Sequence, residues 1–91
     1  MIQLVWRNSA RHDVRRIIEH IAQDDPLAAT RLADLIQATA ERLLRHPRLH
    51  RPGRIAGTRE AVLHPNYILI YRIIDDAVEV LAVVHARQRY P

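Results

Sequence analysis

Cysteine is missing from this 91-residue chain, which excludes a disulfide framework and a thiolate metal site. Long apolar runs are missing too. None approaches the ~20 residues that cross a bilayer, and the N-terminus lacks the basic region and apolar run of a secretion signal. We therefore expect a cytoplasmic protein with no membrane partner. A chain of this length forms one domain, which we assign to residues 1–91.

Lysine is also absent, so all 14 basic residues are arginine and the net charge is +4. An all-arginine set can reflect a GC-rich genome, but the positions of the charges carry more information. Residues 42–59 contain six arginines and no acid, whereas the first 41 residues hold six of the ten acids. This segregation predicts an anionic partner at one end of the fold. The candidate anion-binding residues are Arg48, Arg51, Arg54, Arg59, Arg87 and Arg89.

The first half of the chain predicts a short strand followed by a helical hairpin. Residues 2–6 are apolar strand formers, and Asn8 and Ser9 offer an N-cap for a helix ending near Gln23. Asp25 is a candidate cap for a second helix that begins at Pro26 and stops before Pro47. The apolar stripe expected on this second helix comprises Ala29, Leu32, Ile36, Thr39, Ala40 and Leu43.

The second half predicts three antiparallel strands, at residues 58–63, 67–74 and 78–84. If Asp75 and Asp76 are the two central turn residues, Arg72 lies directly opposite Glu79, and we expect these two to form a structural ion pair. The fold class is therefore α+β, in the order β-α-α-β-β-β. It has a three-stranded antiparallel meander and both helices on one face of the sheet.

Both faces of the predicted hairpin are largely apolar. The register above puts Tyr67, Leu69, Tyr71, Ile73, Val78, Val80, Ala82 and Val84 on one face, and Ile68, Ile70, Leu81, Val83 and His85 on the other. Two helices can cover only one face of a sheet. The second face must therefore be covered by the neighbours of the N-terminal strand and the long loop, or by a partner chain.

Chemically useful side chains gather in the segment 45–60 and in the tail after residue 84. Cleavage of a phosphodiester needs a base, an acid and fixed positive charge at the phosphate. The candidate catalytic residues are His85, Arg87, Arg59 and Tyr90, with Glu60 as a substitute for Tyr90. Alternatively, His85 simply bonds a loop carbonyl. Arg59 and Glu60 point to opposite faces of a strand, so each needs another partner. The histidines show no metal-like clustering, and we expect no metal and no cofactor.

The segments "GRIAGTRE", "NYILIYRI" and "VEVLAVVHARQ" resemble the RelE/ParE superfamily, the toxins of bacterial type II toxin-antitoxin modules. The resemblance runs from Leu4 to Tyr90 and includes the opening of the second helix at Pro26 and the loop "HPRLHRPGR". It implies a small α+β toxin that arrests growth. It also implies a cognate antitoxin that wraps the toxin, which would account for the second apolar face.

The resemblance implies two mechanisms. Ribosome-dependent members that cleave mRNA carry arginine where this chain has Ile68, whereas the histidine and arginine of "VVHAR" are similar to members that poison DNA gyrase by binding. Yet "GTRE" and a proline-ending tail also occur in mRNA interferases. We favour the gyrase poison, which would not be an enzyme. The alternative is a metal-independent endoribonuclease that acts on mRNA at the ribosome. A non-toxic nucleic-acid-binding module is a third, more distant hypothesis.

Overall fold

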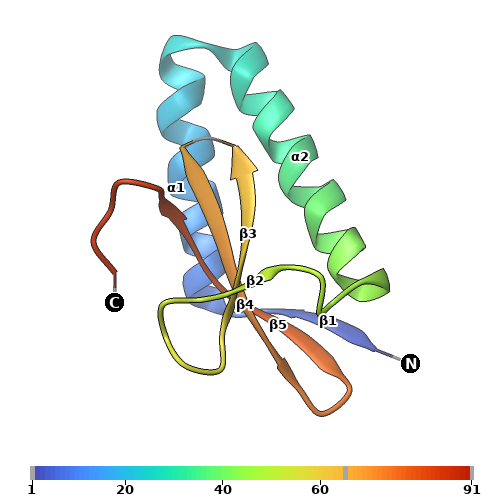
Figure 1. The fold of residues 1–91 in the computed structure, drawn as a ribbon. Helices are drawn as coiled ribbons and strands as arrows, with labels where there is room; N and C mark the ends of the chain where they lie inside the picture. The colour runs from blue at the N-terminus through green and yellow to red at the C-terminus, as the bar shows by residue number, and fades with distance from the viewer. Residues whose placement is uncertain (1, 65, 91) are drawn as a thin grey trace.

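Two helices cover one face of a five-stranded sheet in the computed structural model, which describes residues 2–64 and 66–90 (Figure 1). The strand order is β1-β5-β4-β3-β2; β1 runs parallel to β5, and the other neighbours are antiparallel. The α+β prediction and its meander are confirmed, with the short strand β2 added. The elements are β1 Gln3–Trp6, α1 Asn8–Asp24, α2 Pro26–Arg45, β2 Arg51–Pro52, β3 Arg59–His64, β4 Tyr67–Ile74 and β5 Ala77–His85.

The helical hairpin begins and ends close to where the sequence predicts. Asp25 caps α2 by accepting a hydrogen bond from the backbone N–H of Ala28 at 3.0 Å, with Pro26 in the first turn. The predicted cap of α1 is wrong. Arg7 occupies that position without a side-chain bond, and Ser9 instead donates from its hydroxyl to the carbonyl of Leu81 at 3.0 Å. Neither helix, within the described residues, is long and apolar enough to cross a membrane.

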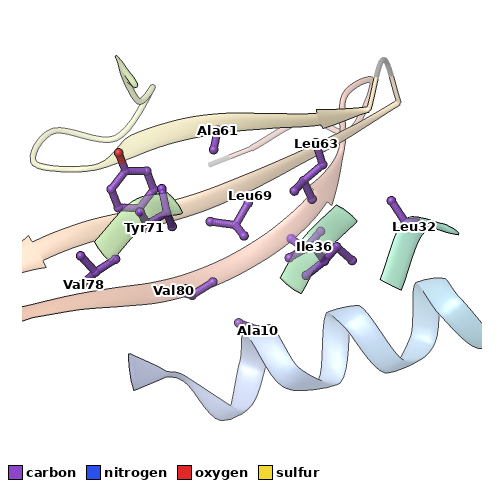
Figure 2. Close-up of a cluster of buried hydrophobic side chains, with 11 residues drawn as sticks. Ala10, Leu32, Ile36, Ala61, Leu63, Leu69, Tyr71, Val78 and Val80 are labelled. Carbon is purple, nitrogen blue, oxygen red and sulfur yellow. The ribbon is translucent and has the colours of Figure 1, made fainter. Parts of the chain in front are cut away.

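The main core lies between the sheet and the two helices. Figure 2 shows side chains of Leu69, Tyr71 and Val80 on the sheet side of this core, with Ile36 and Ala10 on the helix side. All six residues of the predicted α2 stripe are buried, because their spacing of three and four keeps them on one face of the helix. At roughly 1.5–3 kcal/mol for each large apolar side chain, this burial is the main favourable contribution to folding.

A β-bulge at Leu81 changes the face of every residue after it. Arg72 lies opposite Glu79 and Tyr71 opposite Val80, as predicted, but Ile70 then pairs with Ala82. One extra residue moves all later side chains to the other face. The predicted faces from Ala82 onward are therefore wrong, whereas Leu81 packs on the second face as predicted. Val83 belongs to the helix-side core, His85 lies opposite Tyr67 rather than on the second face, and Ala82 and Val84 pack on the second face.

Helix α1 completes the outer edge of β5 beyond the end of β1. The last β1 pairing joins Trp6 to Val80, so the following residues of β5 have no strand on that side. The hydroxyl of Ser9 donates to the Leu81 carbonyl, and the carboxylate of Asp13 accepts from the Val83 N–H at 3.0 Å. Two polar side chains of α1 thus take the place of a strand and protect this edge from unwanted pairing.

The tail folds back over the second face. Ala86 and Tyr90 pack against a small apolar cluster of Ile68, Ile70 and Val84. Part of this face is thus covered by the chain's own C-terminal residues, which the sequence patterns did not indicate. Val62, on the same face, remains 56% exposed.

The loop between β2 and β3 depends on a glycine. The Gly53 N–H donates to the Thr58 carbonyl at 2.7 Å, and a Cβ on Gly53 would overlap the Thr58 hydroxyl oxygen, which itself donates to the Ile55 carbonyl at 2.6 Å. We expect Gly53→Ala to lower the free energy of unfolding by about 1–3 kcal/mol in urea denaturation, because the loop must shift. Gly57→Asn is the matched control: Gly57 has φ +83° and open space around it, and asparagine tolerates that conformation. Equal losses in the two variants would contradict the argument.

Candidate functional site

The buried carboxylate of Glu60 organises the loop arginines. It accepts hydrogen bonds from Nε and a terminal nitrogen of Arg51 at 3.2 and 3.0 Å and from the backbone N–H of Arg54 at 3.2 Å, and Arg54 Nε lies 3.8 Å away. The Glu60 side chain is 3% exposed, whereas those of Arg51 and Arg54 are 56% and 45% exposed. One buried acid therefore fixes the loop while two guanidinium groups face solvent.

Arg59 points to the other face, as its alternation with Glu60 predicts. Its guanidinium donates to the carbonyls of Arg48 and His50 at 3.1 and 2.8 Å. Opposite Arg59 on β4, Tyr71 donates from its hydroxyl to the Pro47 carbonyl at 2.6 Å. Burial raises the pKa of Tyr71, and the charge of Arg59 partly opposes that shift. The side chains of Arg59 and Tyr71 thus hold the loop from the core side. The sequence predicted Arg59 on a strand but did not indicate this role.

His50 lies among these groups, with its ring 6.0 Å from that of Tyr71. Burial lowers the pKa of His50 from its ordinary 6.5, and the charges of Arg42 and Arg59 add to the effect.

The lowered pKa of His50 predicts a loss of stability in acid. Below about pH 6.5 the unfolded chain binds a proton at His50 that the folded chain resists, so the free energy of unfolding falls as the pH drops. In urea denaturation at pH 7.5 and 5.5, we expect His50→Gln to show a smaller loss on acidification than the wild type. The exposed His46→Gln serves as the control and should keep the wild-type loss. An unchanged pH dependence in His50→Gln would contradict this assignment.

The tail lies beside the β3–β4 turn. The Ala86 N–H donates to the Asn66 carbonyl at 2.7 Å. His85 accepts the Arg87 N–H on Nδ1 at 3.1 Å and meets the Tyr67 ring edge-on, with the centroids 5.3 Å apart.

Further along the tail, the guanidinium of Arg54 stacks on the ring of Tyr90, 4.6 Å from its centroid. The Tyr90 hydroxyl is buried and has no hydrogen-bond partner among the described residues. Arg87 and Arg89 are exposed. We call Arg51, Arg54, Arg87 and Arg89 the arginine surface.

Of the four candidate catalytic residues, His85 and Arg87 are in contact through the Arg87 N–H, but the set does not converge at one place. Arg59 and His85 pair with Tyr71 and Tyr67, which are four residues apart on β4, or about 13 Å along a strand. Tyr90 packs on the second face, and Arg87 is in the exposed tail. The structure therefore brings Tyr90 to the loop arginine Arg54, but it does not bring His85 or Tyr90 to Arg59.

Two further predictions concern an ion pair and metals. Arg72 Nε lies 2.5 Å from a carboxylate oxygen of Glu79, so the structural pair is confirmed. Within residues 2–64 and 66–90, the histidines and acids do not form any group of three suited to hold a metal ion. Arg48, the remaining candidate, lines a polar hollow of about 280 Å³ beside Arg59.

Comparison with known proteins identifies the family. Residues 4–90 match the family model described as the ParE toxin of the type II toxin-antitoxin system parDE. The chain belongs to this family. The putative toxin Y4kP of Sinorhizobium fredii is 42% identical over 94% of this chain and 90% of its own. Toxin RelE2 of Caulobacter vibrioides is 35% identical over 94% and 97%.

Solved structures agree on the fold of this toxin. The chromosomal ParDE toxin-antitoxin system of P. aeruginosa includes a chain that superimposes with a TM-score of 0.82 at 20% identity, over 93% of this chain and 96% of that one. The RelE/ParE resemblance of the sequence is thereby confirmed, and the protein is a toxin of a type II toxin-antitoxin system.

Proposed function

We propose that this toxin arrests growth by binding DNA gyrase, and that a cognate antitoxin silences it. The proposal rests on the division of the polar side chains into those that hold the loop and those that face solvent. Arg59, Tyr71 and Glu60 are committed to holding the loop, while the arginine surface remains open to solvent. A surface of exposed guanidinium groups, two of them held by Glu60, without a converged acid and base suits recognition of an anionic partner rather than chemistry on it.

The fixed loop favours binding for an entropic reason. An arginine loses rotamer freedom when it binds, and less is lost when the side chain is already held. Arg51 and Arg54 are held by Glu60, and Arg54 is further held by the Tyr90 ring. The same surface would attract an acidic segment of the antitoxin, so target and antitoxin would compete for it.

Ribosome-dependent cleavage of mRNA is the second candidate, because one specific observation favours it. The Arg87 N–H donates to His85 Nδ1, so a neutral ring carries its proton on Nε2 and could donate a hydrogen bond to the phosphate at the cleaved bond. One relative is named Toxin RelE2, after the RelE branch of the superfamily.

A supercoiling assay with purified gyrase tests the proposal. We expect the toxin to inhibit supercoiling, and the double variant Arg87→Gln/Arg89→Gln to need about fivefold to tenfold more protein, because two exposed charges are lost. Arg11→Gln/Arg31→Gln removes the same charge from exposed helix positions and should inhibit like the wild type.

A cell-free translation reaction tests the alternative in parallel. Mapping of mRNA 5′ ends by primer extension should show intact transcripts. New ends that require ribosomes and disappear in His85→Ala would replace the gyrase proposal by the nuclease. Full supercoiling activity at every toxin concentration would also overturn the proposal.

A further inference from the structure

A second cavity lies on the helix side of the sheet, next to the tail that carries Arg87 and Arg89. It has a volume of about 330 Å³ and opens between α1, the start of β4 and the end of β5. Its floor is aliphatic. Its polar lining comes from four parts of the chain and comprises Arg16, His20, Tyr67, His85 and Gln88.

The polar groups of this cavity are mostly hydrogen-bond donors. His85 accepts the Arg87 N–H on Nδ1, so the proton of the neutral ring is on Nε2 and is free to donate. Gln88 uses its amide oxygen to accept the His85 backbone N–H at 3.4 Å, which leaves the NH₂ group available. The edge-on contact with Tyr67 holds the His85 ring in place. Arg16 and His20 add a guanidinium and a second imidazole from α1.

Asp13, the acid that contacts Arg16, already has other partners. Asp13 accepts the Val83 N–H with one carboxylate oxygen at 3.0 Å, while the other lies 3.6 Å from Arg16. The Asp13 side chain is 19% exposed and does not line the cavity. Arg16 is 64% exposed, so its single long contact leaves most of its donors free. The cavity therefore combines several donors with a lining that contains no acid, although the exposed Glu19 is the neighbour of His20 on α1.

We propose that this cavity is a second anion site, which binds one phosphate group. Phosphate oxygens accept several hydrogen bonds at once, and the fork of an arginine with two imidazoles supplies donors from more than one direction. A volume of about 330 Å³ is near the lower end for small-ligand sites, so it suits a phosphate with its attached sugar rather than a duplex. The site adjoins the arginine surface, because the Arg87 N–H bonds to His85 and Gln88 lies between Arg87 and Arg89, but none of its lining side chains belongs to that surface.

Nuclear magnetic resonance tests this site directly. The ¹⁵N-labelled toxin is titrated with inorganic phosphate, with a nucleoside 5′-monophosphate and with a short single-stranded oligonucleotide that lacks a terminal phosphate. We expect saturable shifts at the imidazoles of His20 and His85 and at the Gln88 side-chain amide. His20→Gln and Arg16→Gln should each weaken binding about tenfold, since each removes a donor. His12→Gln, an exposed histidine of the same helix, should bind like the wild type.

The arms of the titration distinguish the sources of the phosphate. Tighter binding of the monophosphate identifies a free nucleotide as the ligand, and tighter binding of the oligonucleotide identifies a nucleic-acid backbone; either result supports the site. Absence of saturable shifts, or equal affinity in wild type, His20→Gln and Arg16→Gln, overturns it. His20 and Arg16 are exposed, so we expect both variants to fold. An unchanged amide spectrum outside the cavity verifies that they do. None of these outcomes depends on the supercoiling assay.

Discussion

Replacing both Arg51 and Arg54 by alanine should lower the free energy of unfolding by about 3–5 kcal/mol, because the double variant leaves a buried carboxylate without compensating charge. Glu60 is 3% exposed, and its side-chain partners are these two arginines and the Arg54 N–H. Removing the charge of the acid instead, by Glu60→Gln, should lower the free energy of unfolding by less, about 1–3 kcal/mol. The two half-exposed guanidinium groups can then return to water. Urea denaturation at pH 7 measures both.

A third variant separates the charge from the loss of packing. Adding Glu60→Leu to the alanine pair removes the buried charge, so most of the stability should return. If the triple variant is no more stable than the double variant, the loss is due to arginine packing against the loop, and the charge argument is wrong.

Tyr71→Ala should cost about 3–5 kcal/mol, because it empties the largest fully buried side-chain position of the core. Tyr71→Phe isolates the hydroxyl. It removes the 2.6 Å bond to the Pro47 carbonyl and should cost about 1 kcal/mol, while also loosening the loop that carries the arginines. Chemical denaturation gives the free energies, and amide hydrogen exchange of residues 48–54 reports the loop.

Tyr90→Phe is the control for Tyr71→Phe in the denaturation experiment, and it should not lower the free energy of unfolding. Its hydroxyl is buried and has no partner among the described residues, so deleting it should leave stability unchanged or raise it by about 1 kcal/mol. Equal losses for Tyr71→Phe and Tyr90→Phe would mean that the Pro47 bond contributes nothing.

The sequence predicts those parts of the fold that local periodicity controls. The α2 stripe, the Asp25 cap and the turn at Asp75 follow from spacing and side-chain chemistry; Asp75 adopts φ 51°, which an aspartate in such a turn tolerates. The bulge at Leu81 could not be predicted, because both faces of β5 are apolar and neither register leaves a polar residue buried. The direction of the tail after Ala86 could not be predicted either, because an apolar tail residue could pack on either apolar face.

The candidate site was predicted in composition but not in arrangement. The arginine cluster and the need of Glu60 for a partner were evident from charge and alternation. The separation of His85 from Arg59 was not. It depends on the pairing of β3 with β4, which sets how far along the sheet each residue lies. Such long-range register is determined by tertiary packing and is not encoded in short patterns.

The parallel pairing of β1 with β5 determines when this toxin can fold. Leu4 pairs with Val78, so the first strand to leave the ribosome must wait until more than seventy further residues have been synthesised. Contacts of such sequence separation are slow to form and leave apolar segments exposed meanwhile. The toxin is therefore folded only after nearly all of these residues have emerged from the ribosome.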